Sequence, residues 1–158
     1  MYKTRNSLTE NVRNQVAALL NRHLSMAIDL QCQAKQAHWN VKGPNFIALH
    51  ELFDKLTEEV EEFVDTIAER VTALGGTAEG TIQVIAERSA LPRYPLQITD
   101  GKAHLEALSG SLAAFANSVR KAIDESNTLG DADTADLFTG ISREADKQLW
   151  FLEAHLQS

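Results

Sequence analysis

Apolar residues recur at steps of three and four along most of this chain, and this spacing is typical of amphipathic α-helices. The first such stretch begins at the capping-box spacing Ser7-Leu8-Thr9-Glu10 and runs to Ala37 or His38. The second runs from Asn45 and stops at Gly75-Gly76, where a left-handed C-terminal cap is expected. The pattern therefore predicts two long helices in the first half of the chain.

The pattern in the second half of the chain predicts a long connection followed by two more helices. Within that connection, Leu91-Pro92-Arg93-Tyr94-Pro95 excludes regular structure, while the apolar run from Ile82 to Ala86 favours a short helix. The two later helices are expected from a cap at Thr99 or Asp100 to about Asn127, and from a cap at Asp131 or Asp133 to near the terminus.

This order of helices predicts one fold class. Short links within each helix pair and one long link between the pairs are typical of an all-α four-helix bundle with ferritin-like connectivity, with a short extra helix in the crossover between helices 2 and 3. A chain of 158 residues suits a single domain over 1–158, preceded by a short tail at 1–7.

Composition narrows the class of protein further. The 15 Lys and Arg residues against 22 Asp and Glu residues give a net charge of −7, which disfavours non-specific binding to nucleic acid. The single cysteine, Cys32, excludes an intramolecular disulfide framework, fits a reducing compartment and is expected to be a small buried residue. No apolar signal-peptide segment opens the chain and no apolar run is long enough to span a bilayer, so we expect a cytoplasmic protein without a membrane partner.

The second predicted helix carries an unusual set of acids. Between His50 and Glu69 lie eight carboxylates against one cation, Lys55. On a helical wheel, three of these acids follow His50 at about 40°, 60° and 100°, namely Asp54, Asp65 and Glu69. The apolar residues cluster at about 250°, so these potential metal ligands point away from the core of their own bundle. A solvated acidic face is the alternative interpretation of this stripe.

One copy of this helix cannot close a metal site. His50 and Asp65 are 15 residues apart, or about 22 Å along a helix, whereas bonds to a metal are about 2 Å long. The pairs His50–Glu69 and Asp54–Asp65 share a midpoint between residues 59 and 60. Two copies packed antiparallel about a two-fold axis at that midpoint would bring these ligands together. The spacing therefore predicts two metal sites per dimer, each shared between the subunits.

His38 joins this ligand set through the predicted helical hairpin. It lies six residues before Pro44, and His50 lies six residues after it, so the two imidazoles are expected at similar heights. Two histidines and three carboxylates suit iron or manganese, while zinc and copper remain open alternatives. The chain contains no Glu-x-x-His motif, which disfavours an ordinary metal site inside one bundle.

With these residues assembled, the chain resembles the Dps or miniferritin family, the DNA-binding proteins from starved cells. The resemblance covers nearly the whole chain. It is carried by KQAHWNVKG at 35–43, NFIALHELFD at 45–54 and DTIAER at 65–70, and further by GTIQVI at 80–85, YPL at 94–96, VRKAI at 119–123 and LWF at 149–151.

The resemblance implies a ferroxidase centre of two iron ions between subunits, with zinc or manganese as substitutes. Its ligands would be His38, His50 and Asp54 of one subunit and Asp65 and Glu69 of the other. It also implies a homododecameric shell built from two-fold dimers, which oxidises Fe²⁺ preferentially with hydrogen peroxide, stores ferric oxide and thereby protects DNA. Trp39 would be an oxidisable ring beside the metals, or an aromatic residue that packs an interface.

Other acidic residues receive weaker assignments. The family places acids around three-fold pores, which would make an iron entrance of Asp131, Asp133 and Asp136, although the helix dipole alone explains acids at these positions. Near the predicted two-fold axis, Glu58 and Glu61 of two chains would repel, share protons or bind additional cations.

Two rival functions remain open. The alternative to an iron-storing ferroxidase is a nucleoid protein that binds and compacts DNA, with the metal site secondary. Direct DNA binding is doubtful because the first seven residues offer only Lys3 and Arg5 and no lysine-rich tail is present. A third interpretation is a helical scaffold that uses zinc or no metal.

Overall fold

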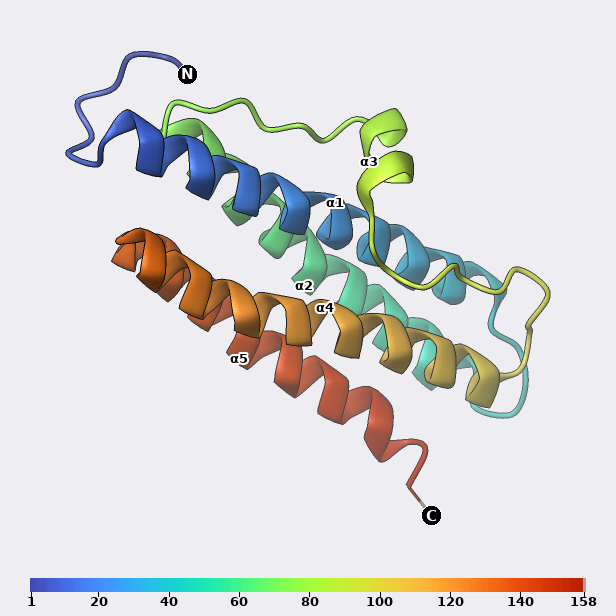
Figure 1. Cartoon of the computed structure of the whole chain (residues 1–158). Coiled ribbons are helices and arrows are strands. Elements are labelled where there is room, and N and C mark those ends of the chain that lie inside the picture. The colour runs from blue at the N-terminus through green and yellow to red at the C-terminus, as the bar shows by residue number, and fades with distance from the viewer. Residues whose placement is uncertain (158) are drawn as a thin grey trace.

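The structure, a computed structural model, describes residues 1–157. Over these residues the fold is all-α, with four long helices in a bundle and one short helix on the crossover (Figure 1). The helices are α1 (Glu10–Asn40), α2 (Phe46–Ala73), α3 (Ile82–Arg88), α4 (Gly101–Leu129) and α5 (Ala132–Ala154). The predicted element order and fold class are therefore confirmed.

The start of α1 differs from the prediction. Thr9, not Ser7, is the N-cap, and its hydroxyl oxygen accepts a hydrogen bond from the backbone N–H of Val12. Just before it, the side-chain oxygen of Asn6 accepts a hydrogen bond from the Leu8 N–H, which turns the backbone at Ser7. This turn includes Ser7 and Leu8, where a helix capped at Ser7 would begin. The helix therefore begins two residues later than a cap at Ser7 predicts.

The glycine stop after α2 is confirmed. Gly75 has φ +83°, a left-handed conformation that glycine adopts without steric cost. A Cβ atom at Gly75 would lie 2.7 Å from the carbonyl oxygen of Tyr2, and the Tyr2 N–H donates to the Gly75 carbonyl oxygen at 2.6 Å. The N-terminal segment is therefore fastened to the end of α2.

The apolar face of α2 packs into the core of the bundle, as the sequence predicted. Its buried residues follow the helical period: Leu49, Phe53, Leu56, Val60, Phe63, Ile67 and Val71. Each fully buried side chain of this size stabilises the fold by about 1.5–3 kcal/mol. Because this face must stay in the core, the acids on the opposite face of α2 remain at the surface.

The crossover lies along α1 and is held by side-chain hydrogen bonds (Figure 1). The amide nitrogen of Gln33 donates to the Pro92 carbonyl oxygen at 3.1 Å, and the Ser111 hydroxyl donates to Gln33 at 2.7 Å. The described helices include none with the length and apolar character needed to cross a membrane.

Candidate metal centre

Two histidines face each other across the hairpin of α1 and α2. Nδ1 of His38 lies 2.8 Å from the carbonyl oxygen of His50, and Nδ1 of His50 lies 2.9 Å from the carbonyl oxygen of His38. Their rings stack with centroids 3.7 Å apart. The hairpin thus brings the two imidazoles to the same height, as predicted.

This reciprocal pairing determines where each ring carries its proton. A carbonyl oxygen can only accept, so each Nδ1 must be the N–H that donates. In the neutral imidazole, Nε2 then holds the lone pair and is the atom that binds a metal. A backbone partner on the second nitrogen also orients the ring, as in many metal sites. The two rings are therefore prepared as metal ligands through Nε2.

Asp54 lies beside the histidines. Its Oδ1 is 3.7 Å from Nδ1 of His38 and forms an ion pair with the ammonium of Lys35. The hydrogen bond from Lys35 lowers the pKa of Asp54 most, and the electrostatic effects of His38, Lys35 and His50 lower it further. A lysine thus pairs with the carboxylate that a metal would use.

The sequence interpretation missed Lys35. A usable signal was present, because Lys35 lies one helical turn before His38 on α1 and so faces α2 at the same side of the hairpin. Nothing in its position along the sequence shows that its ammonium pairs with an acid 19 residues later.

Asp65 and Glu69 lie on the exposed face of α2, away from the histidines. Among residues 1–157, no three His, Cys, Asp or Glu side chains come together closely enough to hold a metal ion. The structure thus pairs His38 with His50 and places Asp54 beside His38, and it leaves the other two predicted ligands apart from them. The intersubunit arrangement of the five residues stays a prediction.

A hollow of about 660 Å³ lies between α1 and α2 and is lined in part by Asp54. Its lining includes Lys35, Trp39, Asp54, Glu58 and Glu61. The Trp39 side chain is 67% exposed, so its ring is available either to a metal site or to a partner subunit.

Cys32 also lines this hollow and corrects one expectation. The thiol is exposed in the chain, whereas the sequence predicted a buried residue. The helical period places Cys32 on the side of α1 that faces out beside α2, and the core positions around it are taken by Leu30 and Ala34.

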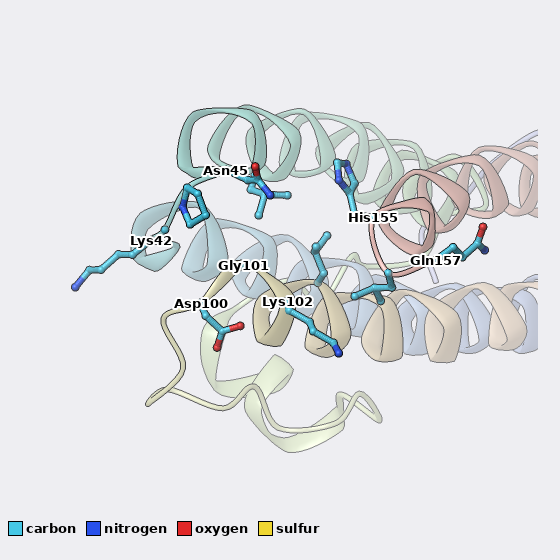
Figure 2. A pocket seen from close by; sticks show the side chains of 12 residues that line it. Lys42, Asn45, Asp100, Gly101, Lys102, His155 and Gln157 are labelled. Atoms are coloured by element: carbon cyan, nitrogen blue, oxygen red, sulfur yellow. The ribbon is translucent and has the colours of Figure 1, made fainter.

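A second hollow of about 450 Å³ lies at the end of the bundle where the hairpin, the start of α4 and the end of α5 meet (Figure 2). Figure 2 shows that the side chain of Lys42 points away from this hollow, while His155 stands between α5 and Asn45. Its lining mixes both charges and polar groups, and no ligand set for a metal is assembled there within residues 1–157.

The three acids of the predicted iron entrance have different environments. Asp131 is only 2% exposed and caps α5, accepting hydrogen bonds from Thr134 and, at 2.8 and 3.0 Å, from the guanidinium of Arg70. Asp133 and Asp136 are exposed. The sequence suggested a cap at Asp131 but missed Arg70, whose guanidinium also lies 3.8 Å from the carboxylate of Asp133. Two of the three acids are therefore engaged within their own chain.

The remaining histidines of residues 1–157 lie outside the candidate centre. His23 is buried and pairs with the carbonyl oxygen of Leu19 and the hydroxyl of Ser118. His104 is buried and pairs with Tyr94, and His155 is exposed. None of them joins the candidate centre.

The chain is similar to known proteins along nearly its whole length. Residues 17–158 match the family model of the ferritin-like domain. The chain is 49% identical to a DNA protection during starvation protein of Agrobacterium fabrum, over 99% of this chain and 96% of the relative. A protein of the same description from Mycolicibacterium smegmatis is 36% identical over 96% of this chain and 82% of its own.

Solved structures agree with these relatives. The tetragonal form of Mycobacterium smegmatis Dps superposes with a TM-score of 0.94 at 35% identity, covering 100% of this chain and 95% of the other. DpsC from Streptomyces coelicolor gives a TM-score of 0.93 at 31% identity, covering 100% of this chain and 91% of its own.

The buried pair of Asp131 and Arg70 predicts a pH effect on stability. Burial by itself raises the pKa of Asp131, but hydrogen bonds from Thr134 and Arg70 outweigh burial and hold the pKa below its ordinary value. A lowered pKa in the folded state stabilises the fold above the unfolded pKa of about 3.9, and this contribution is lost as the pH falls through the folded pKa. We expect Asp131→Asn to lower stability at pH 7 by about 1–3 kcal/mol, because Arg70 loses its charged partner.

Thermal unfolding followed by circular dichroism at neutral and acidic pH measures this effect. The gap between the wild type and Asp131→Asn should narrow as the pH falls below about 4. Asp136→Asn is the matched control, because Asp136 is exposed and pairs with no cation among residues 1–157, and it should leave the melting curve nearly unchanged. A gap that stays constant with pH contradicts the assignment.

Proposed function

This chain belongs to the Dps family of ferritin-like proteins, and from this membership we propose that it oxidises Fe²⁺ with hydrogen peroxide and stores the ferric product in a hollow shell. In this role it protects DNA by removing Fe²⁺ and peroxide together. The observation that carries the proposal is the histidine pair, whose reciprocal hydrogen bonds leave two Nε2 atoms free for metal.

The proposed centre binds two iron ions between two-fold-related subunits. His38, His50 and Asp54 come from one subunit, and Asp65 and Glu69 come from the other. The 22 Å that separates the two groups along α2, about 15 residues at 1.5 Å each, supports this division, since only a second copy can supply the acids. Zinc or manganese fits the same set of nitrogen and oxygen ligands.

The chemistry that this centre would support is a two-electron reaction. Two Fe²⁺ ions each lose one electron, and H₂O₂ takes both electrons and two protons to become two waters. Paired electron transfer avoids the hydroxyl radical, which forms when peroxide receives a single electron. Trp39, exposed beside the histidine pair, is proposed as an oxidisable ring at this centre.

The proposed assembly is a cytoplasmic dodecamer built from two-fold dimers. Iron would enter at three-fold pores, for which Asp133 and Asp136 are the exposed acids, while Asp131 holds the start of α5 through Arg70. Glu58 and Glu61, exposed near the middle of α2, would meet their counterparts close to the two-fold axis and attract further cations.

A complementation experiment tests whether the centre is shared. Subunits with His38→Ala and His50→Ala lack one half of the proposed ligand set, and subunits with Asp65→Ala and Glu69→Ala lack the other. Each variant alone should fail to oxidise Fe²⁺ rapidly while its helical shell stays intact. Refolded equal mixtures should recover about a quarter of the wild-type rate, because half of the dimers are mixed and each mixed dimer keeps one of its two sites.

The rate is read from the absorbance of the ferric product after Fe²⁺ and peroxide are added, and assembly is checked by size-exclusion chromatography. Equal mixtures that stay as inactive as their components contradict a shared centre. Full activity of the variant without Asp65 and Glu69 contradicts the ferroxidase proposal itself.

Lys35 provides a second test, because its ammonium lies on Asp54 where a metal would bind. We expect Lys35→Gln to bind Zn²⁺, a redox-inert stand-in for Fe²⁺, with a lower dissociation constant, since the metal no longer displaces a cation. Calorimetric titration of the shell measures the affinity. Lys55→Gln removes an exposed lysine elsewhere on α2 and should leave the affinity unchanged; an equal change in both variants contradicts a specific competition.

Direct DNA binding is the remaining alternative, and the anchored N-terminal segment disfavours it. Only Lys3 and Arg5 offer positive charge there, on a segment that is fastened at Tyr2 and Gly75. We expect no retardation of linear DNA in a gel at low salt. A variant extended by a lysine-rich tail is the positive control. Retardation of the native protein that falls steeply with salt would establish phosphate contacts and favour a DNA-binding function.

A further inference from the structure

A half-buried tyrosine on the crossover and a buried histidine on α4 form a pair that the proposed iron chemistry does not use. Oη of Tyr94, on the crossover, lies 2.6 Å from Nδ1 of His104, on α4. His104 is 1% exposed, and the two rings are nearly parallel, with an interplanar angle of 21°. A phenol and an imidazole joined by one short hydrogen bond are the two parts needed to move a proton when an electron leaves the phenol.

The surroundings indicate which atom donates. With Nδ1 taken by Tyr94, the nitrogen left to His104 is Nε2, which is buried without a hydrogen-bond partner. A phenol O–H is a stronger acid than the N–H of a neutral imidazole, so the Tyr94 hydroxyl donates to Nδ1 and the neutral ring carries its hydrogen at Nε2. The backbone of Asn40 and Ile98 raises the pKa of His104, which favours the imidazolium when a proton arrives.

Both groups rest in their neutral forms. Burial is the largest effect on His104 and lowers its pKa, so the ring is uncharged at neutral pH. Burial also raises the pKa of Tyr94, so the phenol keeps its proton. Asp100, one helical turn before His104 on the same side of α4, raises the pKa of His104 and so stabilises a transient imidazolium. The pair is thus arranged to pass one proton from oxygen to nitrogen.

This pair lies behind the candidate metal centre. The His104 ring packs 6.3 Å from the ring of Phe53, which directly precedes Asp54 in α2. Asn40, whose backbone faces His104, lies two residues after His38 in α1. The pair is therefore separated from the proposed ligand Asp54 by the side chain of Phe53, and from His38 by less than one turn of α1. Electrons cross such short separations readily.

We propose that Tyr94, with His104 as its proton acceptor, is a radical-quenching site that reduces one-electron oxidants of hydroxyl-radical strength formed inside the protein. This site rests on the proposed function for its oxidant, because Fe²⁺ that reduces peroxide by one electron yields such a radical. Its function is to reduce the radicals that escape the paired reaction.

The step balances in electrons and protons. The Tyr94 O–H bond breaks, one electron passes to the hydroxyl radical to give hydroxide, and the proton passes to Nδ1 of His104. This leaves a neutral phenoxyl radical beside an imidazolium. A stored or incoming Fe²⁺ then returns one electron to become Fe³⁺, and the proton moves back from His104 to Tyr94. The net change is one hydroxyl radical and one Fe²⁺ converted to hydroxide and Fe³⁺.

A purely structural latch between the crossover and α4 is the rival role for this pair. The variant His104→Gln distinguishes the structural role from the proton-accepting role, because the glutamine carbonyl can still accept the Tyr94 hydrogen bond but cannot retain a proton. The chain has two tyrosines, and the other, Tyr2, is 72% exposed, so Tyr2→Phe gives a background in which any tyrosyl radical belongs to Tyr94.

Electron paramagnetic resonance of rapidly frozen, assembled protein measures the radical. In one arm, Fe²⁺-loaded Tyr2→Phe protein is mixed with excess hydrogen peroxide. In the other, the metal-free protein is oxidised by photoexcited ruthenium tris-bipyridine with persulfate. We expect a tyrosyl signal in both arms, its loss in Tyr2→Phe/Tyr94→Phe, and a fall toward that background in Tyr2→Phe/His104→Gln. Circular dichroism and size-exclusion chromatography check each variant for folding and assembly.

The two arms separate failure of this inference from failure of the proposed function. A signal with the photo-oxidant but none with iron and peroxide supports the Tyr94 site and contradicts the proposed iron chemistry as its source of radicals. No tyrosyl signal with the photo-oxidant overturns the site. An undiminished signal in a folded His104→Gln variant overturns the role of His104 and leaves the pair as a latch.

Discussion

The reciprocal hydrogen bonds between His38 and His50 are the interaction on which the candidate site depends. They join the end of α1 to the start of α2, determine the tautomer of both rings and leave both Nε2 atoms available. The bonds form only if the hairpin closes in this register, and the buried apolar face of α2 imposes that register, because a rotation of the helix would take Phe53 and Leu56 out of the core. Core packing therefore positions the ligands at the surface.

The same packing is the physical basis for proposing that the ligand set is divided between subunits. A straight helix can present its acids on one face, but it cannot fold back to bring residues 50 and 65 to one metal. Ferritin-like bundles with Glu-x-x-His motifs avoid this problem by pointing ligands inward from several helices. Here the proposed ligands lie on the outer face of the bundle, so under the proposed function a neighbouring copy would supply what the chain lacks. A centre built in this way would exist only in the assembled protein, and it would couple iron oxidation to the formation of the shell.

Hydrophobic period and turn residues predicted most of the fold, because both act locally. The helix order, the cap at Gly75 and the height of the two histidines all follow from spacing along the chain. What the sequence did not predict depends on contacts between distant residues. Lys35 finds Asp54, and Arg70 finds Asp131, only after the helices have packed. The exposure of Cys32 was missed because the prediction relied on the usual burial of cysteine. The position of Cys32 around the helix was not considered.

Among the acids singled out as possible ligands or pore residues, Lys35 and Arg70 pair with some and leave others without a basic partner. Asp54 and Asp131 each have a basic partner within the chain, so their charges are neutralised where they are fixed. Among residues 1–157, Asp65 and Glu69 form no ion pair on the outer face of α2. Bringing such acids from two subunits together without a cation would cost electrostatic energy, because like charges repel most strongly where water is excluded. In the proposed dimer, an incoming Fe²⁺ would relieve that repulsion, so the acids left without partners in one chain are those best placed to attract iron.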